Sequence, residues 1–328
     1  MAHIKFKESE DRIYGLLGIA SDTVSLGIEV DYGLRWEDVF ADAVKRIVQS
    51  GNVDILTDIV EPEPENNLAS WVPDFHRVKG SLLREWSFQS TKPFSAGGRL
   101  DGNPDRRVRD EDQFEIGRRI LLCRGVVVDK IAKVGQRWEP HPESGSYFAN
   151  FQGYLDTITT IREFSVKSAA SVEVDCIDPQ EALKIRDRRM ESAWRVPIMD
   201  HESFGNSLQK RRATKENAAR VMDELLNSDY ATTQIFGPDV KDYLNCSAIL
   251  KDYAPFLGIK GFMGLCNPRM KAGDVVCVLY GATVPFVLRP TGDADDGTFQ
   301  LIGEAYCDTV MDGEALDMGP EPRTFRLV

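Results

Sequence analysis

Hydrophobic side chains recur every three or four positions in several parts of the chain, which is the spacing of an amphipathic helix. The clearest run extends from Trp36 to Val48 and is followed by the pair Ser50-Gly51, a plausible helix end. Another run follows Asp178-Pro179, where Asp178 suits the N-cap and Pro179 suits the first helical position. We therefore predict helices over residues 36–48 and from residue 179 onward. The same spacing predicts further helices at 151–161, 214–227 and 238–253.

The C-terminal stretch from Gly261 to Leu316 has a different pattern. Short runs of β-branched and aromatic residues alternate there with turn sequences that contain glycine and aspartate. Runs at 275–280 and 284–288, separated by Gly281-Ala282, predict a hairpin, and a run at 299–306 predicts a third strand. The fold class predicted is α+β, with a helical N-terminal and middle part and a small antiparallel β-sheet or open barrel near the C-terminus.

A further run of β-branched residues occurs at 120–131 and predicts a strand or a hairpin with Arg124-Gly125 at the bend. A polar stretch rich in turn residues precedes it and predicts a connector. These features divide the chain into four expected segments. They are a mostly helical part (1–86), a polar connector (87–113), a strand pair plus helices (114–256) and a small antiparallel β unit (257–328).

The composition narrows the classes of partner. The net charge is −12 over 328 residues, so the field of the whole protein repels nucleic acid and anionic lipid. No apolar run approaches the ~20 residues that span a bilayer. The N-terminal sequence MAHIKFKESEDR lacks the apolar core of a signal peptide. These features predict a cytosolic or nuclear protein that binds neither nucleic acid nor membrane, and we take the cytoplasm as the expected location.

Six cysteines are present, none of them in a C-x-x-C pair or followed by histidine at zinc-ligand spacing. We expect free thiols in a reducing compartment, and we predict neither a metal site nor a cofactor. A nucleophilic cysteine stays open as an alternative, although the sequence does not assign it a partner histidine.

Four polar residues are candidates for acid–base catalysis. His201 follows Asp200, and imidazole titrates near neutral pH, although adjacent residues on a strand or helix point apart. Glu304 and Arg289 lie on neighbouring predicted strands. A carboxylate beside an apolar wall can act as a general acid or base, and Arg289 can orient a carboxylate or an enolate. The alternative is a structural pair between Arg289 and Glu304 across the strands.

The aromatic segment Ser70–His76 supplies candidates for ligand binding. Trp71, Asp74 and His76 would form a shelf for a ligand, and Tyr306 is a further candidate. The alternative is that the aromatic rings of this segment fill a core, because buried aromatic side chains bury so much apolar area.

Several short motifs occur along the chain in a definite order. Upstream they are Asp11-Arg-Ile-Tyr14 with Leu16-Leu-Gly18, Ser70-Trp-Val-Pro-Asp74, Gly125 with Asp129-Lys-Ile131, and Trp194-Arg195 with Asp200. In the C-terminal stretch they are Gly261-x-x-Gly264-Leu265, Pro268, Gly273-Asp274, Gly281 with Pro285, Leu288-Arg289, Leu301-Ile-Gly-Glu-Ala-Tyr306 and Met311-Asp-Gly-Glu314. This order resembles the C-terminal part of fungal heterokaryon-incompatibility (HET) proteins. One departure is Cys266, where the family commonly has glycine.

The resemblance places residues 11–18 directly after the family's HET domain. It therefore implies a chain that lacks this N-terminal effector domain, with residues 1–86 as the remnant of a HET-type region. It implies an accessory or regulatory protein that recognises a small-molecule ligand or a protein partner. The alternative is a stand-alone enzyme of fungal secondary metabolism with acid–base residues in a pocket of the same scaffold. A deep pocket with convergent polar groups favours a ligand or substrate, whereas an exposed apolar patch near residues 11–20 favours a partner.

Overall fold

The structure is a computed structural model that describes residues 8–17, 26–59, 66–77, 80–98, 119–139, 151–172, 178–203, 210–227, 237–292 and 297–328. Its α-helices are α1 (Asp11–Leu17), α3 (Trp36–Gln49), α4 (Leu82–Gln89), α5 (Phe151–Ala170), α6 (Pro179–Arg195), α7 (Lys215–Asn227), α8 (Pro238–Ser247) and α9 (Glu314–Asp317). Short 3₁₀ helices are η1 (Val53–Asp58), η5 (Val196–Ile198) and η6 (Ala248–Lys251).

The strands are β1 (Leu121–Val134), β2 (His201–Ser203), β3 (Lys210–Arg212), β4 (Ala254–Gly258), β5 (Met263–Cys266), β6 (Val275–Leu279), β7 (Phe286–Pro290), β8 (Thr298–Cys307) and β9 (Arg323–Leu327). Strands β2 and β3 form a separate two-stranded sheet. The other strands form one sheet in the order β4-β5-β8-β7-β6-β1-β9. Because β4 also pairs with β1, and β8 pairs in parallel with β9, this sheet closes on itself as a barrel.

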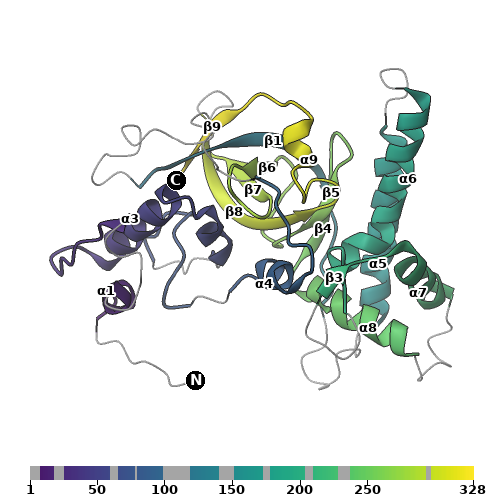
Figure 1. Cartoon of the computed structure of the whole chain (residues 1–328), viewed down its shortest axis with the longest axis horizontal. Coiled ribbons are helices and arrows are strands. Elements are labelled where there is room, and N and C mark those ends of the chain that lie inside the picture. Colours follow the sequence, from purple (N-terminus) through teal and green to yellow (C-terminus); the bar gives the residue numbers. More distant parts are fainter. Residues whose placement is uncertain are drawn as a thin grey trace.

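The barrel lies between two helical parts (Figure 1). Helices α1 and α3 lie on one side, and helices α5 to α8 lie on the other, where α6 projects away from the barrel. Both faces of the barrel strands are buried. In β6, Val276 and Val278 belong to one buried apolar cluster, whereas Cys277 and Leu279 belong to the cluster that includes α3. This alternation follows from the two-residue period of a strand, and burial on both faces explains the continuous apolar run in the sequence.

Two glycines of the motifs described above allow close backbone contacts in the barrel. A Cβ atom on Gly264 would lie 1.9 Å from the carbonyl oxygen of Tyr306, and one on Gly125 would lie 2.2 Å from that of Val278. Any side chain at these positions would force neighbouring strands apart, so the motif glycines are explained by strand packing.

The α+β prediction is confirmed, and so are the predicted helix over 36–48, which is α3, and the three predicted C-terminal strands, which are β6, β7 and β8. The predicted cap of α6 is confirmed, because Oδ1 of Asp178 accepts hydrogen bonds from the N–H groups of Gln180 at 2.8 Å and Glu181 at 3.2 Å.

Of the two alternatives for residues 120–131, the strand is confirmed and the hairpin is wrong. The run forms one continuous strand, β1, in which Gly125 pairs with Leu279 of β6 and does not bend the chain back. The sequence also does not predict β4, β5 and β9, which are short and contain proline, glycine or several polar residues. These strands form because β1 and β8 offer them backbone partners, which overrides weak local propensity.

The division of the chain into four segments stays a prediction, and residues 99–113 of the expected connector lie outside the described residues. Every helix in the part of the chain that the structure describes is too short or too polar to cross a membrane.

Candidate functional site

The structure separates the two members of the predicted Asp200–His201 pair. Met199 and Asp200 both have positive φ, 46° and 56°, and this tight turn leads from η5 into β2. The carboxylate of Asp200 pairs with Arg212 at 2.7 Å. Burial raises the pKa of Asp200 to about 6, against the opposing charges of Arg212 and Arg195.

The His201 side chain is fully buried and packs edge-on against Phe94, with 4.8 Å between ring centroids. Its Nδ1 donates to the carbonyl oxygen of Met199 at 2.8 Å, and its buried Nε2 has no hydrogen-bond partner among the residues that the structure describes. Burial lowers the pKa of His201 to about 4, so the ring is neutral at neutral pH. Asp200 and His201 therefore have separate partners, because Asp200 lies in the turn with positive φ and His201 begins β2.

Glu304 of β8 is buried beside the N-terminal end of α4, and Arg289 is not its partner. One of its carboxylate oxygens accepts from the hydroxyl of Ser81, the N-cap of α4, and the other accepts from Tyr253 at 2.5 Å. Burial raises the pKa of Glu304 to about 7, although both hydroxyl donors oppose the shift. The carboxyl group thus joins β8 to α4 and to the segment before β4.

Arg289 pairs with Asp274 and not with Glu304. Its Nε and Nη2 donate to the two oxygens of Asp274, each at 2.9 Å, and Nη2 also donates to the carbonyl oxygen of Arg269 at 2.7 Å. The alternative of a structural pair is therefore correct in kind, but its expected partner is wrong. Cross-strand register explains the difference, because Arg289 lies opposite Gln300 and Glu304 lies opposite Phe286.

The three residues of the predicted ligand shelf are engaged by partners within the fold. Trp71 is fully buried in the cluster that includes α3, and its Nε1 donates to the carbonyl oxygen of Arg119 at 3.3 Å. Asp74 is buried and lies 2.8 Å from Nδ1 of His76, whose ring packs edge-on against Trp36. This arrangement matches the alternative in which the aromatic segment fills a core.

Tyr306 is also enclosed. Its hydroxyl donates to Oδ1 of Asp308 at 2.9 Å, and burial raises its pKa well above the ordinary value. Asp308 in turn accepts from Arg195 and Ser192 of α6. Tyr306 therefore belongs to a buried network between α6 and the barrel.

Two cavities in the described part of the chain are instead lined mostly by residues that the sequence did not single out. The larger is a groove with a volume of about 1030 Å³ between the barrel and α5. We call it the barrel–α5 groove. Its walls are mostly polar and come from the segment after β1, from α5, from Ala254 of β4 and from the loop after β5. The lining residues are Gly135, Gln136, Arg137, Glu139, Gly153, Asp156, Thr157, Thr160, Ala254, Asn267, Pro268 and Arg269.

Several side chains of the barrel–α5 groove are held in place. Arg137 lies 3.2 Å from Glu139, and Gln152 donates to Asp156 at 2.9 Å. Nη2 of Arg269 donates to the carbonyl oxygen of Ile302 at 2.6 Å. Because Arg289 binds the carbonyl oxygen of Arg269, the predicted catalytic arginine supports one wall of this groove from behind.

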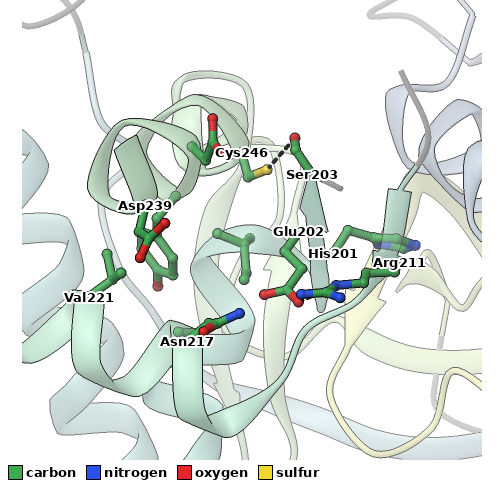
Figure 2. A pocket seen from close by; sticks show the side chains of 12 residues that line it. His201, Glu202, Ser203, Arg211, Asn217, Val221, Asp239 and Cys246 are labelled. Carbon is green, nitrogen blue, oxygen red and sulfur yellow. Dashed lines mark hydrogen bonds and ion pairs between the residues drawn. The ribbon is translucent and has the colours of Figure 1, made fainter. Parts of the chain in front are cut away.

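The smaller cavity, the β2–β3 pocket, has a volume of about 70 Å³ and lies among η5, β2, β3, α7 and α8 (Figure 2). Figure 2 shows Glu202 on the same side of β2 as Asp239 and Val221, with the His201 ring on the opposite side. Glu202 pairs with Arg211 at 2.6 Å. At one end of this pocket, Cys246 of α8 lies 3.6 Å from Ser203 of β2.

Among the predicted site residues, His201 lines the β2–β3 pocket, and neither cavity has Asp200, Glu304 or Arg289 in its lining. No group of three or more His, Cys, Asp and Glu side chains among the described residues is placed to hold a metal ion. A sequence signal for the groove was present in Pro268, which belongs to the ordered motifs, but only the fold shows that α5 lies opposite it.

Comparisons with known proteins agree with the barrel. Residues 237–328 match the family described as the Het-6 beta-barrel domain. The chain is 26% identical, over an alignment of 366 positions, to heterokaryon incompatibility protein 6, OR allele, of Neurospora crassa. That alignment covers 97% of this chain and 50% of the relative, so the chain spans about half the length of the curated relative it matches. No solved structure matches the chain significantly.

The match to the barrel family contains the strands β4 to β9, and the similarity to the Neurospora protein extends through the helical parts as well. The resemblance identified in the ordered motifs is therefore confirmed: residues 237–328 match the Het-6 beta-barrel family, and nearly the whole chain is similar to a heterokaryon incompatibility protein.

Proposed function

We propose that this protein is a recognition module of a heterokaryon-incompatibility system, and that it binds a polar peptide segment of a protein partner in the barrel–α5 groove. The observation that carries the proposal is the groove itself, a cavity of about 1030 Å³ shared by the barrel and α5. Its place between two parts of the fold is typical of binding sites.

The chemistry of the lining favours a peptide over an apolar small molecule. Small-molecule sites are lined predominantly by hydrophobic and aromatic side chains, whereas Ala254 and Pro268 are the apolar residues among those that line this groove. The lining offers charges of both signs, from Arg137, Arg269 and Asp156, together with the hydroxyls of two threonines. Such a surface suits the backbone and polar side chains of an extended segment.

A photo-crosslinking experiment tests this proposal. A photoreactive phenylalanine replaces Gln136 in the groove, and in a matched protein it replaces Leu183, an exposed residue of α6. In an extract of a filamentous fungus, we expect a discrete crosslinked product from position 136. The double variant Arg137→Glu/Asp156→Lys, which reverses two groove charges, should abolish that product, and position 183 should not give it. Equal products from both positions, or a product that survives charge reversal, would contradict the proposal.

A second candidate function is an enzyme, and one observation favours it. Glu304 is a buried carboxyl group whose pKa of about 7 lies in the range of a general acid or base at neutral pH. For catalysis this group would have to exchange its bond to Ser81 or Tyr253 for one to a substrate. Incubation of the protein with fungal metabolites, compared with the variant Glu304→Gln, tests the idea. Consumption of a metabolite by the unmodified protein alone supports an enzyme, and identical metabolite profiles contradict it.

A further inference from the structure

Cys246 lies against a cation and a hydroxyl group at one end of the β2–β3 pocket. Nζ of Lys210 is 3.5 Å from the Cys246 sulfur and donates to the hydroxyl of Ser203 at 3.1 Å. The Ser203 hydroxyl is 3.6 Å from the same sulfur (Figure 2). Since the Ser203 oxygen already accepts from Lys210, its proton is available to the sulfur. The sulfur therefore faces two donors, one of which carries a full positive charge.

The other cysteines that the structure describes have a different environment. Cys123, Cys266, Cys277 and Cys307 lie on barrel strands within buried apolar clusters. Burial raises the pKa of Cys123 to about 12 and also raises the pKa values of the other three thiols. Because the reactive form of cysteine is the thiolate, these four thiols are expected to be inert.

Lys210 is held in place by a contact with Trp86 as well as by the Cys246 sulfur. Its ammonium group lies 4.7 Å from the ring centroid of Trp86 on α4, a cation–π contact. Cys246 lies near the C-terminal end of α8, where the helix dipole disfavours an anion. The partial negative charge of the helix end is spread over the carbonyl groups of the last turn, whereas Lys210 places a whole positive charge against the sulfur. The ammonium therefore has the larger electrostatic effect on a negative charge at the sulfur.

A small oxidant has room to reach this sulfur. Cys246 is almost fully buried, but it lines the β2–β3 pocket, whose volume of about 70 Å³ exceeds the roughly 10–15 Å³ that one water molecule needs. Hydrogen peroxide has two oxygen atoms and is uncharged, so it fits this space. Larger thiol reagents are restricted by the burial of Cys246.

We propose that Cys246 is a peroxide-reactive thiol activated by Lys210 and Ser203. The thiolate sulfur attacks one oxygen of hydrogen peroxide, so that an S–O bond forms and the O–O bond breaks. The departing hydroxide takes a proton from the Lys210 ammonium and leaves as water. Sulfur is oxidised by two electrons, peroxide is reduced by two, and the product is the sulfenic acid of Cys246, whose oxygen accepts from Ser203.

The experiment measures sulfenic acid at each cysteine. The folded protein is treated with hydrogen peroxide for increasing times, and catalase then removes the peroxide. The protein is unfolded in urea that contains dimedone, so that buried sulfenic acids are labelled, and peptides are quantified by mass spectrometry. The peptide with Cys246 should be labelled at least about tenfold faster than the peptide with Cys277, because an ammonium group lies in contact with the Cys246 sulfur. The Cys176 peptide, which lies outside the described residues, is quantified separately.

Two variants of Lys210 and one control variant test whether Cys246 reacts because Lys210 activates it or only because peroxide can reach it. Lys210→Met should lower the labelling rate of Cys246 about tenfold, and Lys210→Arg, which keeps the charge, should retain most of it. Lys215→Met removes an exposed lysine five residues along the chain and should leave the rate unchanged. Urea unfolding confirms that each variant is folded. The proposal is overturned if Cys246 reacts no faster than Cys277, or if Lys210→Met and Lys215→Met have the same rate.

Discussion

Arg195 of α6 and Asp308 at the end of β8 form a buried two-point ion pair. Nε of Arg195 lies 2.9 Å from Oδ1 of Asp308, and Nη2 lies 2.8 Å from Oδ2, with both side chains almost inaccessible to solvent. Burial alone would raise the pKa of Asp308, but the charge of Arg195 outweighs it and lowers the pKa below its ordinary value. Ser192 and Tyr306 add hydrogen bonds to the same carboxylate, so this pair attaches α6 to the barrel.

Removal of the Arg195 guanidinium should destabilise the protein strongly. In the variant Arg195→Met, Asp308 stays buried without its partner, and breaking a buried pair in this way costs about 3–5 kcal/mol. Urea unfolding followed by circular dichroism measures the loss. Arg35→Met is the matched control, because Arg35 pairs with Asp38 at the surface and such pairs contribute at most about 1 kcal/mol.

A second variant tests whether the loss comes from the unpaired charge. Arg195→Met combined with Asp308→Asn leaves no buried charge at this position, so we expect it to recover about half of the stability lost in Arg195→Met. If the double variant is as unstable as the sum of the two single variants, the charge is not the cause of the loss.

Gly264→Ala should disrupt the barrel. The added Cβ would lie 1.9 Å from the carbonyl oxygen of Tyr306, and a backbone atom of the neighbouring strand has little freedom to move. We expect a loss of about 3 kcal/mol or more in urea unfolding, at the upper end of overpacking effects. Gly237→Ala is the control, since a Cβ there meets no atom of the described residues within 4 Å. Similar stability of the two variants would show that the strand contact is not as tight as described.

Glu304 should make stability depend on pH near neutrality. Burial raises its folded-state pKa from 4.5 to about 7, so the proton is held more tightly in the folded protein than in the unfolded chain. The stability that this protonation contributes is complete below pH 4.5 and is lost as pH rises through about 7. The shift corresponds to a loss of roughly 3 kcal/mol over this interval.

Comparison with Glu304→Gln isolates this effect, because glutamine has a similar shape and does not titrate. The difference in unfolding free energy between the two proteins, measured in urea from pH 4.5 to 8, should change in favour of the variant as pH rises. Glu321→Gln, at an exposed position, is the control and should follow the unmodified protein. Parallel profiles for Glu304→Gln and the unmodified protein would rule out a raised pKa at Glu304.

Arg289→Met should weaken both the barrel and the barrel–α5 groove. The variant removes two hydrogen bonds to Asp274 and the bond to the carbonyl oxygen of Arg269, and hydrogen bonds with a charged partner contribute about 1.5–3 kcal/mol. Crosslinking from position 136 should decrease together with stability. Lys271→Met removes an exposed cation from the loop that contains Arg269, and it should change neither the stability nor the crosslinking. Normal crosslinking in Arg289→Met would show that Arg289 does not support the barrel–α5 groove.

The local elements were largely predictable because their signals are local. The apolar period defines α3, and the hydrogen bonds of Asp178 to the first turn of α6 follow from the residue types at positions 178–181. The candidate site was not predictable in the same way. Arg289 and Glu304 lie on paired strands, but the register places Arg289 beside Asp274 and turns Glu304 toward Ser81, which is 223 residues away in the chain.

The sequence by itself determined the resemblance to heterokaryon-incompatibility proteins, the α+β class, several helix positions and the three central barrel strands. Only the tertiary structure decided that the sheet closes through β1 and β4, that Arg195 binds Asp308 at a separation of 113 residues, and that α5 forms a groove with the barrel. The physical reason is that backbone propensity and apolar period act between near neighbours. The partner of a buried charge, in contrast, is selected by how whole elements pack, and many partners of the right chemistry are available along the chain.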